Sequence, residues 1–465
     1  MLKTNNNLGL WLSLTVLLVA TLLAQQYVQA DNKTTTNKLD STYFNTLLRL
    51  SSFDELDSSI ASINKTWSAA YIPQAIETAI NARNSHVYSR LMAVLEQQTG
   101  QKFGSDSHAW YQWLWNQPEH LTADYADFKA DLYKNIDPRF ERYFRSRQPS
   151  ARIRLDEIRW GGVRQDGIPP LRQPEMISAD EAGYLDDDNI VFGIQINGDA
   201  RAYPKRILAW HEMFVDTVGG VDIAGVYCTL CGTVIPYKTT FNGVKHDLGT
   251  SGFLYRSNKL MYDKATQSLW NTIKGEPVLG PLADSGIALE HLSVVTTTWS
   301  EWLRRHPDTT VLSLNTGHHR NYAEGFAYKE YFSTDQLMFN TPFDDTRLNN
   351  KQEVLALRFS ASPKEQLAID TDFLLKNPLY KAKIGQQKIV ILTDSSGANR
   401  VYDPKAVNFI SYDRDSTAID SNGDKWTLNE ETLLAKDGRR LSRLPYHRAF
   451  WFGWHATYPE TRLIK

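Results

Sequence analysis

The chain is poor in cysteine, in net charge and in long apolar runs. It has only two cysteines among 465 residues, which excludes a disulfide-rich scaffold. The formal net charge is −2, so we expect no nucleic-acid partner, because such proteins need a basic face. The sequence also lacks a Gly-x-Ser-x-Gly segment, which disfavours a serine hydrolase. Beyond the N-terminal segment, no run is long and apolar enough to cross a bilayer.

The N-terminus has the three parts of a secretory signal. Lys3 supplies the positive charge, residues 8–23 form an apolar run without a charge, and residues 28–30 (Val-Gln-Ala) offer small residues at a cleavage site. The alternative is an uncleaved anchor helix, but the run is shorter than the roughly 20 apolar residues of a span. We therefore predict a signal peptide over residues 1–30, cleaved after Ala30. The mature protein would be periplasmic or secreted and not an integral membrane protein.

The rest of the chain predicts an α+β protein with an N-terminal helical domain. A polar, flexible lead-in occupies residues 31–40, and residues 41–150 show apolar stripes at helical spacing. One stripe comprises Val87, Leu91, Val94 and Leu95. Residues 104–115 loosely resemble the end of a HEAT-like helical repeat, and their three tryptophans are expected to pack in the core.

Residues 151–465 predict a β-rich domain. Glycine, proline and aspartate become frequent, and short β-branched runs replace the helical stripes. Strands are expected at 190–196, 221–227 and 234–241. The first and third of these end in Asn-Gly, which is typical of a hairpin turn.

Two stretches of the β-rich domain share landmarks in the same order. The landmarks, first stretch against second, are Val191 with Val354, Gly232 with Gly397, Tyr237 with Tyr402, Trp270 with Trp426, and Trp299 with Trp451. Both stretches end in Trp-x-x-Trp followed by proline, an acid and threonine. These repeats predict a pseudo-duplication, with halves at about 185–315 and 350–465. The alternative is chance similarity between turn-rich strands.

The two cysteines form a Cys-x-x-Cys-Gly segment, Cys228 to Gly232. A strand precedes it and a β-branched run follows, so we expect a knuckle in a turn between strands and no helix start. Three interpretations remain open. The pair is a metal site, a redox-active or redox-switched pair, or an inert disulfide.

A metal site would need a further ligand besides the two thiolates. His211 is the first candidate, because its segment precedes the thiol strand by about a dozen residues, and His246 and His447 are the others. Two thiolates and an imidazole suit copper as well as zinc. We predict that both sulfurs face inward toward His211.

Two other classes of function are compatible with the sequence. A small-molecule enzyme could use a pocket lined by Arg201, Tyr203 and Glu212, although Arg201 could equally pair with a nearby acid. An envelope binding module could present a tryptophan-rich surface to a glycan, a peptide or an envelope protein, since the chain has 13 tryptophans.

These segments together resemble a bacterial family named domain of unknown function 3179. The matching segments are 198–204, 211–212, 216–220, 227–233, 251–258, 261–263, 268–270, 298–302 and 306–309. The resemblance covers about residues 155–465 and implies the fold unit, with no assigned activity. Many members have proline where this chain has Thr229, a difference that a knuckle tolerates.

Overall fold

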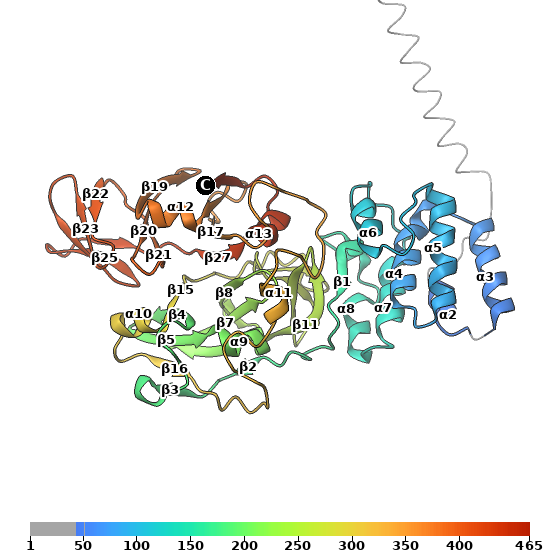
Figure 1. The fold of residues 1–465 in the computed structure, drawn as a ribbon, viewed down its shortest axis with the longest axis horizontal. Coiled ribbons are helices and arrows are strands. Elements are labelled where there is room, and N and C mark those ends of the chain that lie inside the picture. The colour runs from blue at the N-terminus through green and yellow to red at the C-terminus, as the bar shows by residue number, and fades with distance from the viewer. Residues whose placement is uncertain (1–42, 51) are drawn as a thin grey trace, which may run out of the picture.

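The computed structural model describes residues 43–50 and 52–465, which form a helical part at one end and a larger β-rich part at the other (Figure 1). The predicted signal peptide and the whole of the predicted lead-in lie outside the described residues. Within the described ranges, no helix is long and apolar enough to span a membrane. The predicted α+β class, with helices first and sheets after them, is confirmed.

The helical part contains the stripes that the sequence predicted. Its helices are α2 (Tyr43–Leu47), α3 (Phe53–Lys65), α4 (Ile72–Asn81), α5 (Ser85–Thr99), α6 (Ser107–Trp115), α7 (Tyr125–Tyr133) and α8 (Glu141–Phe144). The α5 stripe of Val87, Leu91, Val94 and Leu95 is buried. Of the tryptophans on α6, Trp110 is fully buried, which supports the prediction of core packing.

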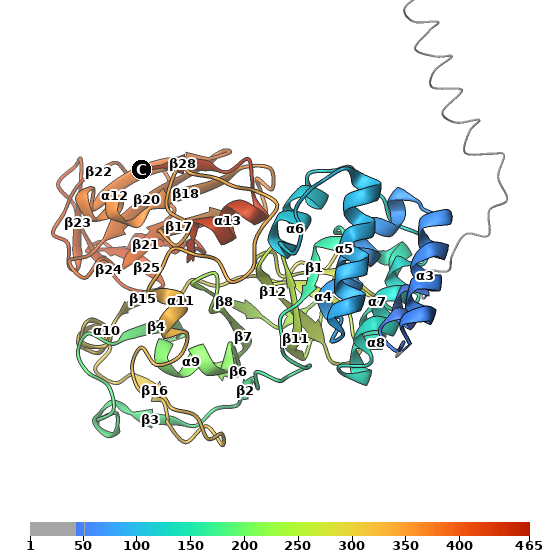
Figure 2. The ribbon, with the colours of Figure 1, turned by 45° about the vertical axis from the view of Figure 1, so that its right-hand side comes forward.

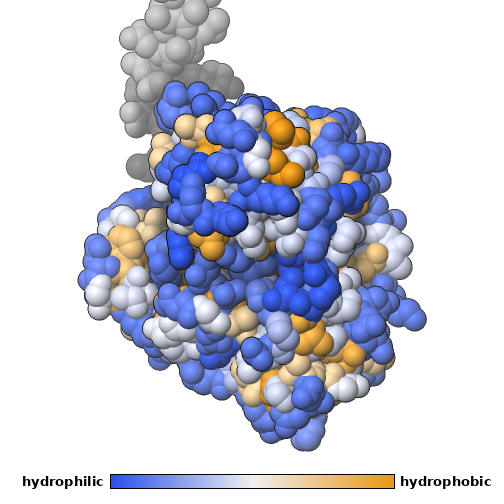
Figure 3. All heavy atoms as spheres, turned by 90° about the vertical axis from the view of Figure 1, so that its left-hand side faces the viewer, coloured by the Kyte–Doolittle hydropathy of each residue, from blue (hydrophilic) through white to orange (hydrophobic). Residues whose placement is uncertain are grey.

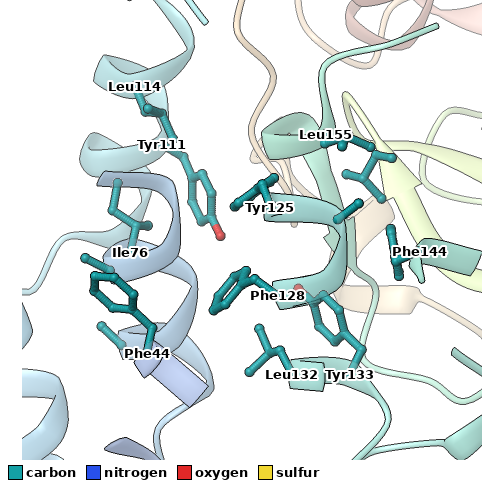
Figure 4. Packing of buried hydrophobic residues seen from close by; sticks show 14 of the residues in the cluster. Phe44, Ile76, Tyr111, Leu114, Tyr125, Phe128, Leu132, Tyr133, Phe144 and Leu155 are labelled. Atoms are coloured by element: carbon teal, nitrogen blue, oxygen red, sulfur yellow. The ribbon is translucent and has the colours of Figure 1, made fainter. Parts of the chain in front are cut away.

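The core of the helical part continues into the first sheet of the β-rich part. Side chains of α2, α4, α6 and α7 pack together (Figure 4), and the ring of Phe253, in the sheet, packs edge-on against Tyr133, Phe140 and Phe144. Lys129, buried on α7, binds Glu77 at 2.6 Å and donates to the backbone oxygen of Ile158 at 2.9 Å. Apolar burial and the hydrogen bond from Lys129 to Ile158 therefore join the two parts.

Three sheets form the lower layer of the β-rich part in Figures 1 and 2. The first, joined to the helices, has the order β1 (Ile158–Trp160), β11 (Leu248–Tyr255), β12 (Asn258–Asp263), β13 (Leu269–Asn271), β14 (Glu276–Leu279). The second has the order β15 (Val295–Thr298), β4 (Ile190–Ile196), β5 (Asp199–Pro204), β16 (Thr310–Leu312), β3 (Met176–Ser178). The third has the order β2 (Leu171–Arg172), β6 (Met213–Val218), β7 (Val221–Cys228), β8 (Thr233–Lys238). A short hairpin pairs β9 (Thr240–Phe241) with β10 (Val244–Lys245).

The C-terminal residues form the upper layer, which also has three sheets. The first has the order β27 (His447–Phe450), β17 (Glu353–Arg358), β18 (Gln366–Asp370), β28 (Arg462–Ile464). The second has the order β19 (Leu379–Ile384), β20 (Gln387–Thr393), β21 (Asn399–Tyr402). The third has the order β22 (Phe409–Tyr412), β23 (Thr417–Asp420), β24 (Lys425–Leu428), β25 (Thr432–Ala435), β26 (Arg440–Ser442).

Short helices punctuate these layers. They are α9 (Lys205–His211), α10 (Trp299–Arg305), α11 (Lys329–Phe332), α12 (Thr371–Lys376) and α13 (Trp451–Thr457). Helix α11 lies in the long connection between the layers, and α13 follows β27 directly. The strands predicted at 190–196 and 221–227 are confirmed as β4 and β7, and the one predicted at 234–241 is divided between β8 and β9.

Candidate functional site

The cysteines occupy a turn between two antiparallel strands, as the sequence predicted. Strand β7 ends at Cys228 and β8 begins at Thr233. The turn is closed by the backbone N–H of Cys231, which donates to the oxygen of Cys228 at 3.1 Å. Gly232 adopts a left-handed conformation with φ of 58°, and an added Cβ would meet the ring of Phe450 at 2.8 Å. Glycine therefore allows both the turn and the close approach of Phe450.

The two sulfur atoms lie 2.6 Å apart and are buried, with Cys228 2% exposed and Cys231 fully enclosed. Burial alone raises the pKa of a thiol. At Cys228 the hydrogen bond from Cys231 and one from the backbone N–H of Lys259 outweigh burial, so its pKa is lowered. Burial and the neighbouring Cys228 sulfur raise the pKa of Cys231. Cys228 is therefore the sulfur that ionises first.

A tight hairpin brings Lys259 and Ser257 to the sulfurs. Arg256 and Ser257 connect β11 to β12, and both have positive φ, 50° and 65°. That combination is typical of a type I′ turn, which usually needs glycine or asparagine. The backbone oxygen of Ser257 lies 3.5 Å from the Cys231 sulfur. The hairpin thus places a backbone acceptor beside one sulfur and a backbone donor beside the other.

A buried ion pair stands next to the thiols. The Lys259 ammonium binds the Glu212 carboxylate at 2.5 Å, and both side chains are 8% exposed. Glu212 ends α9 with a left-handed backbone (φ of 54°), and its backbone oxygen accepts from Tyr227, the residue before Cys228. The Tyr328 hydroxyl donates to the same carboxylate at 3.2 Å. The negative charge of Glu212 raises the pKa of Cys228, and the positive charge of Lys259 lowers it. Both contributions are smaller than those of burial and of the hydrogen bonds.

Aromatic and apolar side chains cover the sulfurs. Leu230, Tyr331, Phe450 and Phe452 form one buried cluster with the two cysteines. The Tyr331 hydroxyl donates to the backbone oxygen of Leu230 at 2.7 Å, which fixes α11 over the turn. On the other side, an added Cβ on Gly453 would lie 3.0 Å from the Cβ of Cys231, so α13 packs directly on the turn.

The ring of His211 hydrogen-bonds to groups other than the two sulfurs. His211 is the last residue of α9. Its Nδ1 lies 2.9 Å from the oxygen of Pro169 and its Nε2 lies 2.6 Å from the Tyr322 hydroxyl, so both ring nitrogens are engaged elsewhere. Burial lowers the pKa of His211 to about 4. The chain reverses direction at Glu212. The charged side chain near the cysteines is therefore that of Glu212, the residue after His211.

The other candidate ligands also have different neighbours. His246 contacts Asp263 at 3.2 Å and packs against Trp270. His447 lies in β27 beside Trp454 and His291. Among the described residues, no group of three or more histidine, cysteine or acidic side chains is arranged to hold a metal ion. The predicted convergence of imidazole on the two thiolates is therefore not found.

The predicted pocket of Arg201, Tyr203 and Glu212 divides into two separate groups. Arg201 pairs with Asp199 at 2.9 Å and with Asp216 at 2.8 Å. The Tyr203 hydroxyl donates to the same Asp216 carboxylate at 2.6 Å. These contacts satisfy Arg201 and Tyr203 within the second and third sheets, while Glu212 belongs to the cysteine site.

The structure also bears on the tryptophan-rich surface. Every described tryptophan is buried or half-buried, and six of them are among the largest fully buried side chains. The large hydrophobic side chains that are exposed in the described ranges include no tryptophan. The tryptophans serve the core, and the surface needed by an envelope binding module is not found there.

Sequence reasoning missed Lys259, Tyr328, Tyr331 and Phe450. Lys259 directly follows residues 251–258, one of the segments that resemble the family. This position in the sequence was the one signal that could have pointed to Lys259. Tyr328 and Tyr331 come from the connection between the layers, and Phe450 from the end of β27. Their approach to the cysteines depends on tertiary packing.

The fold and the site define a class of protein with two β-rich layers. A turn with a buried pair of cysteines lies where the two layers meet. The chain belongs to the family described as "Protein of unknown function (DUF3179)", whose model matches residues 165–461. Comparison with curated proteins and with solved structures found no match.

Proposed function

We propose that this protein is a thiol-redox protein whose reversible dithiol/disulfide pair is Cys228 and Cys231. The observation that carries the proposal is the adjacency of the sulfurs, 2.6 Å apart, with opposite pKa shifts. The two cysteines are thus chemically distinct, because the pKa of Cys228 is lowered and that of Cys231 is raised. This difference suits a nucleophilic and a resolving thiol.

The proposed exchange transfers two electrons. The Cys228 thiolate attacks one sulfur of a disulfide substrate, forms a mixed disulfide and releases the substrate's other sulfur as a thiolate. Cys231 then loses its proton, attacks the Cys228 sulfur and releases the second substrate thiolate. The protein ends as a disulfide and the substrate as a dithiol. The reverse sequence reduces the protein.

Access to Cys228 is controlled by its cover. The cluster of Leu230, Tyr331, Phe450 and Phe452 encloses the sulfurs, so a disulfide substrate reaches Cys228 only when this cover lifts. Helix α11 has only four residues, and the Tyr331–Leu230 hydrogen bond fastens it over the turn. We propose that α11 is the element that moves.

Trapping of the mixed disulfide tests the proposal. Cys231→Ser protein retains the attacking thiolate and lacks the resolving thiol, so it should accumulate a mixed disulfide with oxidised glutathione, detected by intact mass. Cys228→Ser protein should accumulate far less, because burial, the largest cause of the raised pKa of Cys231, remains in that variant. Equal adduct formation by both variants, or none by either, would contradict the assignment.

A second pair of variants tests the cover. Tyr331→Phe removes the hydroxyl that fastens α11 and should accelerate adduct formation at Cys228 by several-fold, since one hydrogen bond contributes about 0.5–1.5 kcal/mol. Phe326→Ala is the matched control, because Phe326 lies in the same connection and is 53% exposed. Unchanged rates in the Tyr331→Phe protein would show that another route admits the substrate.

Export is part of the proposal, because a stable dithiol/disulfide couple with a disulfide substrate belongs in an oxidising compartment. The three-part N-terminal segment of residues 1–30 supports it. N-terminal sequencing of the mature protein should find Asp31 first. Soluble cytoplasmic protein beginning at Met1 would contradict export.

We also propose that the β-rich part arose by duplication of one unit. In one sheet β4 pairs antiparallel with β15 and β5, and β5 pairs parallel with β16; in the other, β17, β27, β18 and β28 pair in the same way. The strand pairings agree with the aligned landmarks: Gly193 faces Val295, and Ala356 faces His447. Val295 and His447 each lie four residues before the first tryptophan of the helix that follows.

Two further contacts support the duplication. Trp302 donates to Thr309 at 2.9 Å, and Trp454 donates to Thr461 at 3.0 Å. Isolated bridges join Tyr237 to His291 and Tyr402 to Arg443. In a crystal structure the halves should superpose with Gly232 on Gly397 and Trp299 on Trp451. Unrelated positions for these pairs would contradict the duplication.

A further inference from the structure

A cavity of about 850 Å³ lies between the two layers of the β-rich part. Its lining includes Gln195 on β4, His291 in the segment before β15, Arg358 at the end of β17, and Tyr458 after α13. Neither cysteine lines it, nor do Glu212 and Lys259. Viewed from the β-rich end, the molecule is hollowed between an upper and a lower lobe, and the hollow is mainly hydrophilic (Figure 3). The cavity is therefore separate from the thiol site.

Arg358 contributes a positive charge to the lining of this cavity. Two other cations of the lining have carboxylate partners at 2.8 Å: Lys238 binds Glu290, and Arg443 binds Glu430. No carboxylate oxygen of the described residues lies within 4.0 Å of the Arg358 guanidinium, although Glu276 in the same lining is close enough to act on its charge. Among the described residues, Arg358 donates to the Tyr237 hydroxyl at 3.2 Å and to the backbone oxygen of Lys274 at 3.3 Å.

Unpartnered polar atoms gather around this guanidinium. In the described part of the chain, Nε of Arg358, Nε2 of His291 and both ring nitrogens of His447 are buried without a hydrogen-bond partner. The rings of His291 and His447 are 6.4 Å apart, centroid to centroid. Leaving each such atom unpaired costs about 1–3 kcal/mol, and buried polar groups usually have a partner. Several in one place indicate a ligand that completes them.

The charge and protonation of the group decide the ligand's chemistry. Burial and the positive charge of Arg358 lower the pKa of His447 to about 3, and they also lower that of His291 well below its usual value. Both imidazoles are therefore neutral near pH 7, and each offers one N–H donor. A guanidinium beside two such donors repels a metal cation and attracts an anion. The planar guanidinium fork matches the two oxygens of a carboxylate or a phosphate.

We propose that the cavity binds a small polar molecule through a terminal oxyanion, a carboxylate or phosphate, held by Arg358 and His291. His447 lies behind this end of the cavity, with its ring next to that of His291, and does not itself line the cavity. The remaining volume, lined by Gln195 and Tyr458 among others, accommodates the rest of the molecule. This site is independent of the thiol chemistry, so failure of one proposal leaves the other standing.

Calorimetric titration of the full chain with inorganic phosphate and, separately, with succinate tests the proposal. At least one probe should bind, and Arg358→Gln should weaken binding by about tenfold or more, which corresponds to about 1.4 kcal/mol. Lys238→Gln is the control, because Lys238 lines the same cavity with its charge already paired; its affinity should stay close to wild type. A response to phosphate alone indicates a phosphorylated molecule, and one to succinate alone a carboxylic acid.

His291→Phe keeps Arg358 and removes one ring donor, so it tests the site even where Arg358→Gln fails to fold. It should also weaken binding of the responding probe. The proposal is overturned by two results. One is the absence of any heat from either probe at ~10 mM, tenfold above a Kd of about 1 mM. The other is unchanged affinity in the folded Arg358 and His291 variants, which would mean that the probe binds elsewhere on the protein.

Discussion

Two turns that we propose to be equivalent differ in how their polar atoms are satisfied. The turn between β7 and β8 holds Cys228 and Cys231, whose sulfurs have each other and two backbone groups as partners. The turn between β20 and β21 holds Asp394, which accepts hydrogen bonds from the backbone of Ser396 and Ala398, each at 3.0 Å. Both turns contain a glycine with positive φ, Gly232 and Gly397.

The second turn is closed by charge. The other Asp394 oxygen binds Arg400 at 2.8 Å, and Arg400 in turn binds Glu430 at 2.7 Å. Burial raises the pKa of Glu430, but Arg400 and Arg443 outweigh it and hold that pKa well below its usual value. Every member of this network has a fixed partner. The ion pairs of the turn between β20 and β21 stabilise the fold. The turn between β7 and β8 instead holds two ionisable sulfurs next to each other.

The largest expected effect comes from breaking the network of the second turn. Arg400→Met should lower the free energy of unfolding by about 3–5 kcal/mol, because it leaves the buried carboxylates of Asp394 and Glu430 without their shared cation. Urea unfolding followed by fluorescence measures the loss. Arg439→Ala, which breaks exposed ion pairs with Asp424 and Asp437, is the control and should lower stability little, because solvent screens exposed ion pairs. A loss in Arg400→Met no larger than the control would contradict a structural role.

The two glycines should differ in their tolerance of a side chain. Gly232→Ala forces a Cβ against the Phe450 ring at 2.8 Å, whereas the Cβ of Gly397→Ala meets Leu375 at 3.2 Å. Both substitutions carry the left-handed backbone cost of about 1–2 kcal/mol, and overpacking adds about 1–3 kcal/mol at Gly232. Thermal unfolding should therefore show the greater loss for Gly232→Ala. Equal losses would show that Phe450 moves aside freely.

The smallest effect is a pair of opposite shifts at Cys228. Lys259→Gln removes the cation and leaves Glu212 charged, so the pKa of Cys228 should rise; Glu212→Gln removes the anion, so it should fall. The pH at which iodoacetamide labelling of Cys228 reaches half its maximum should move up in the first variant and down in the second. Lys245→Gln, which breaks an exposed pair with Asp222, should leave it unchanged. Shifts in the same direction for both site variants would contradict the electrostatic account.

The sequence predicted the local structure of the site because that structure depends on neighbouring residues. β-branched runs on either side of Cys228 favoured strands, and Gly232 allowed the turn between them. The same reasoning failed at His211, because residues 207–214 divide into the end of a helix and the start of a strand. Glu212 turns the chain at that point with a positive φ that few glutamates adopt. No apolar pattern signals such a reversal.

The chemical environment of the thiols could not be read from the sequence in the same way. Lys259, Tyr331 and Phe450 come from three distant segments, and each reaches the turn through sheet and helix packing. The tryptophans gave an opposite lesson: their number suggested a surface, yet Trp302 and Trp454 are fully buried and donate to Thr309 and Thr461. Aromatic count alone does not separate core from interface.

An equilibrium redox titration of the purified mature protein tests the central claim most directly. The protein is equilibrated in glutathione buffers of graded potential, its free thiols are alkylated, and the labelled peptides and bound metal are both quantified. The account predicts that Cys228 and Cys231 lose their thiols together in one two-electron transition, as an intramolecular disulfide forms, with no stoichiometric metal on the reduced protein. Two thiols that stay free at the most oxidising potential, or a metal ion bound in equal amount to the reduced chain, would contradict it.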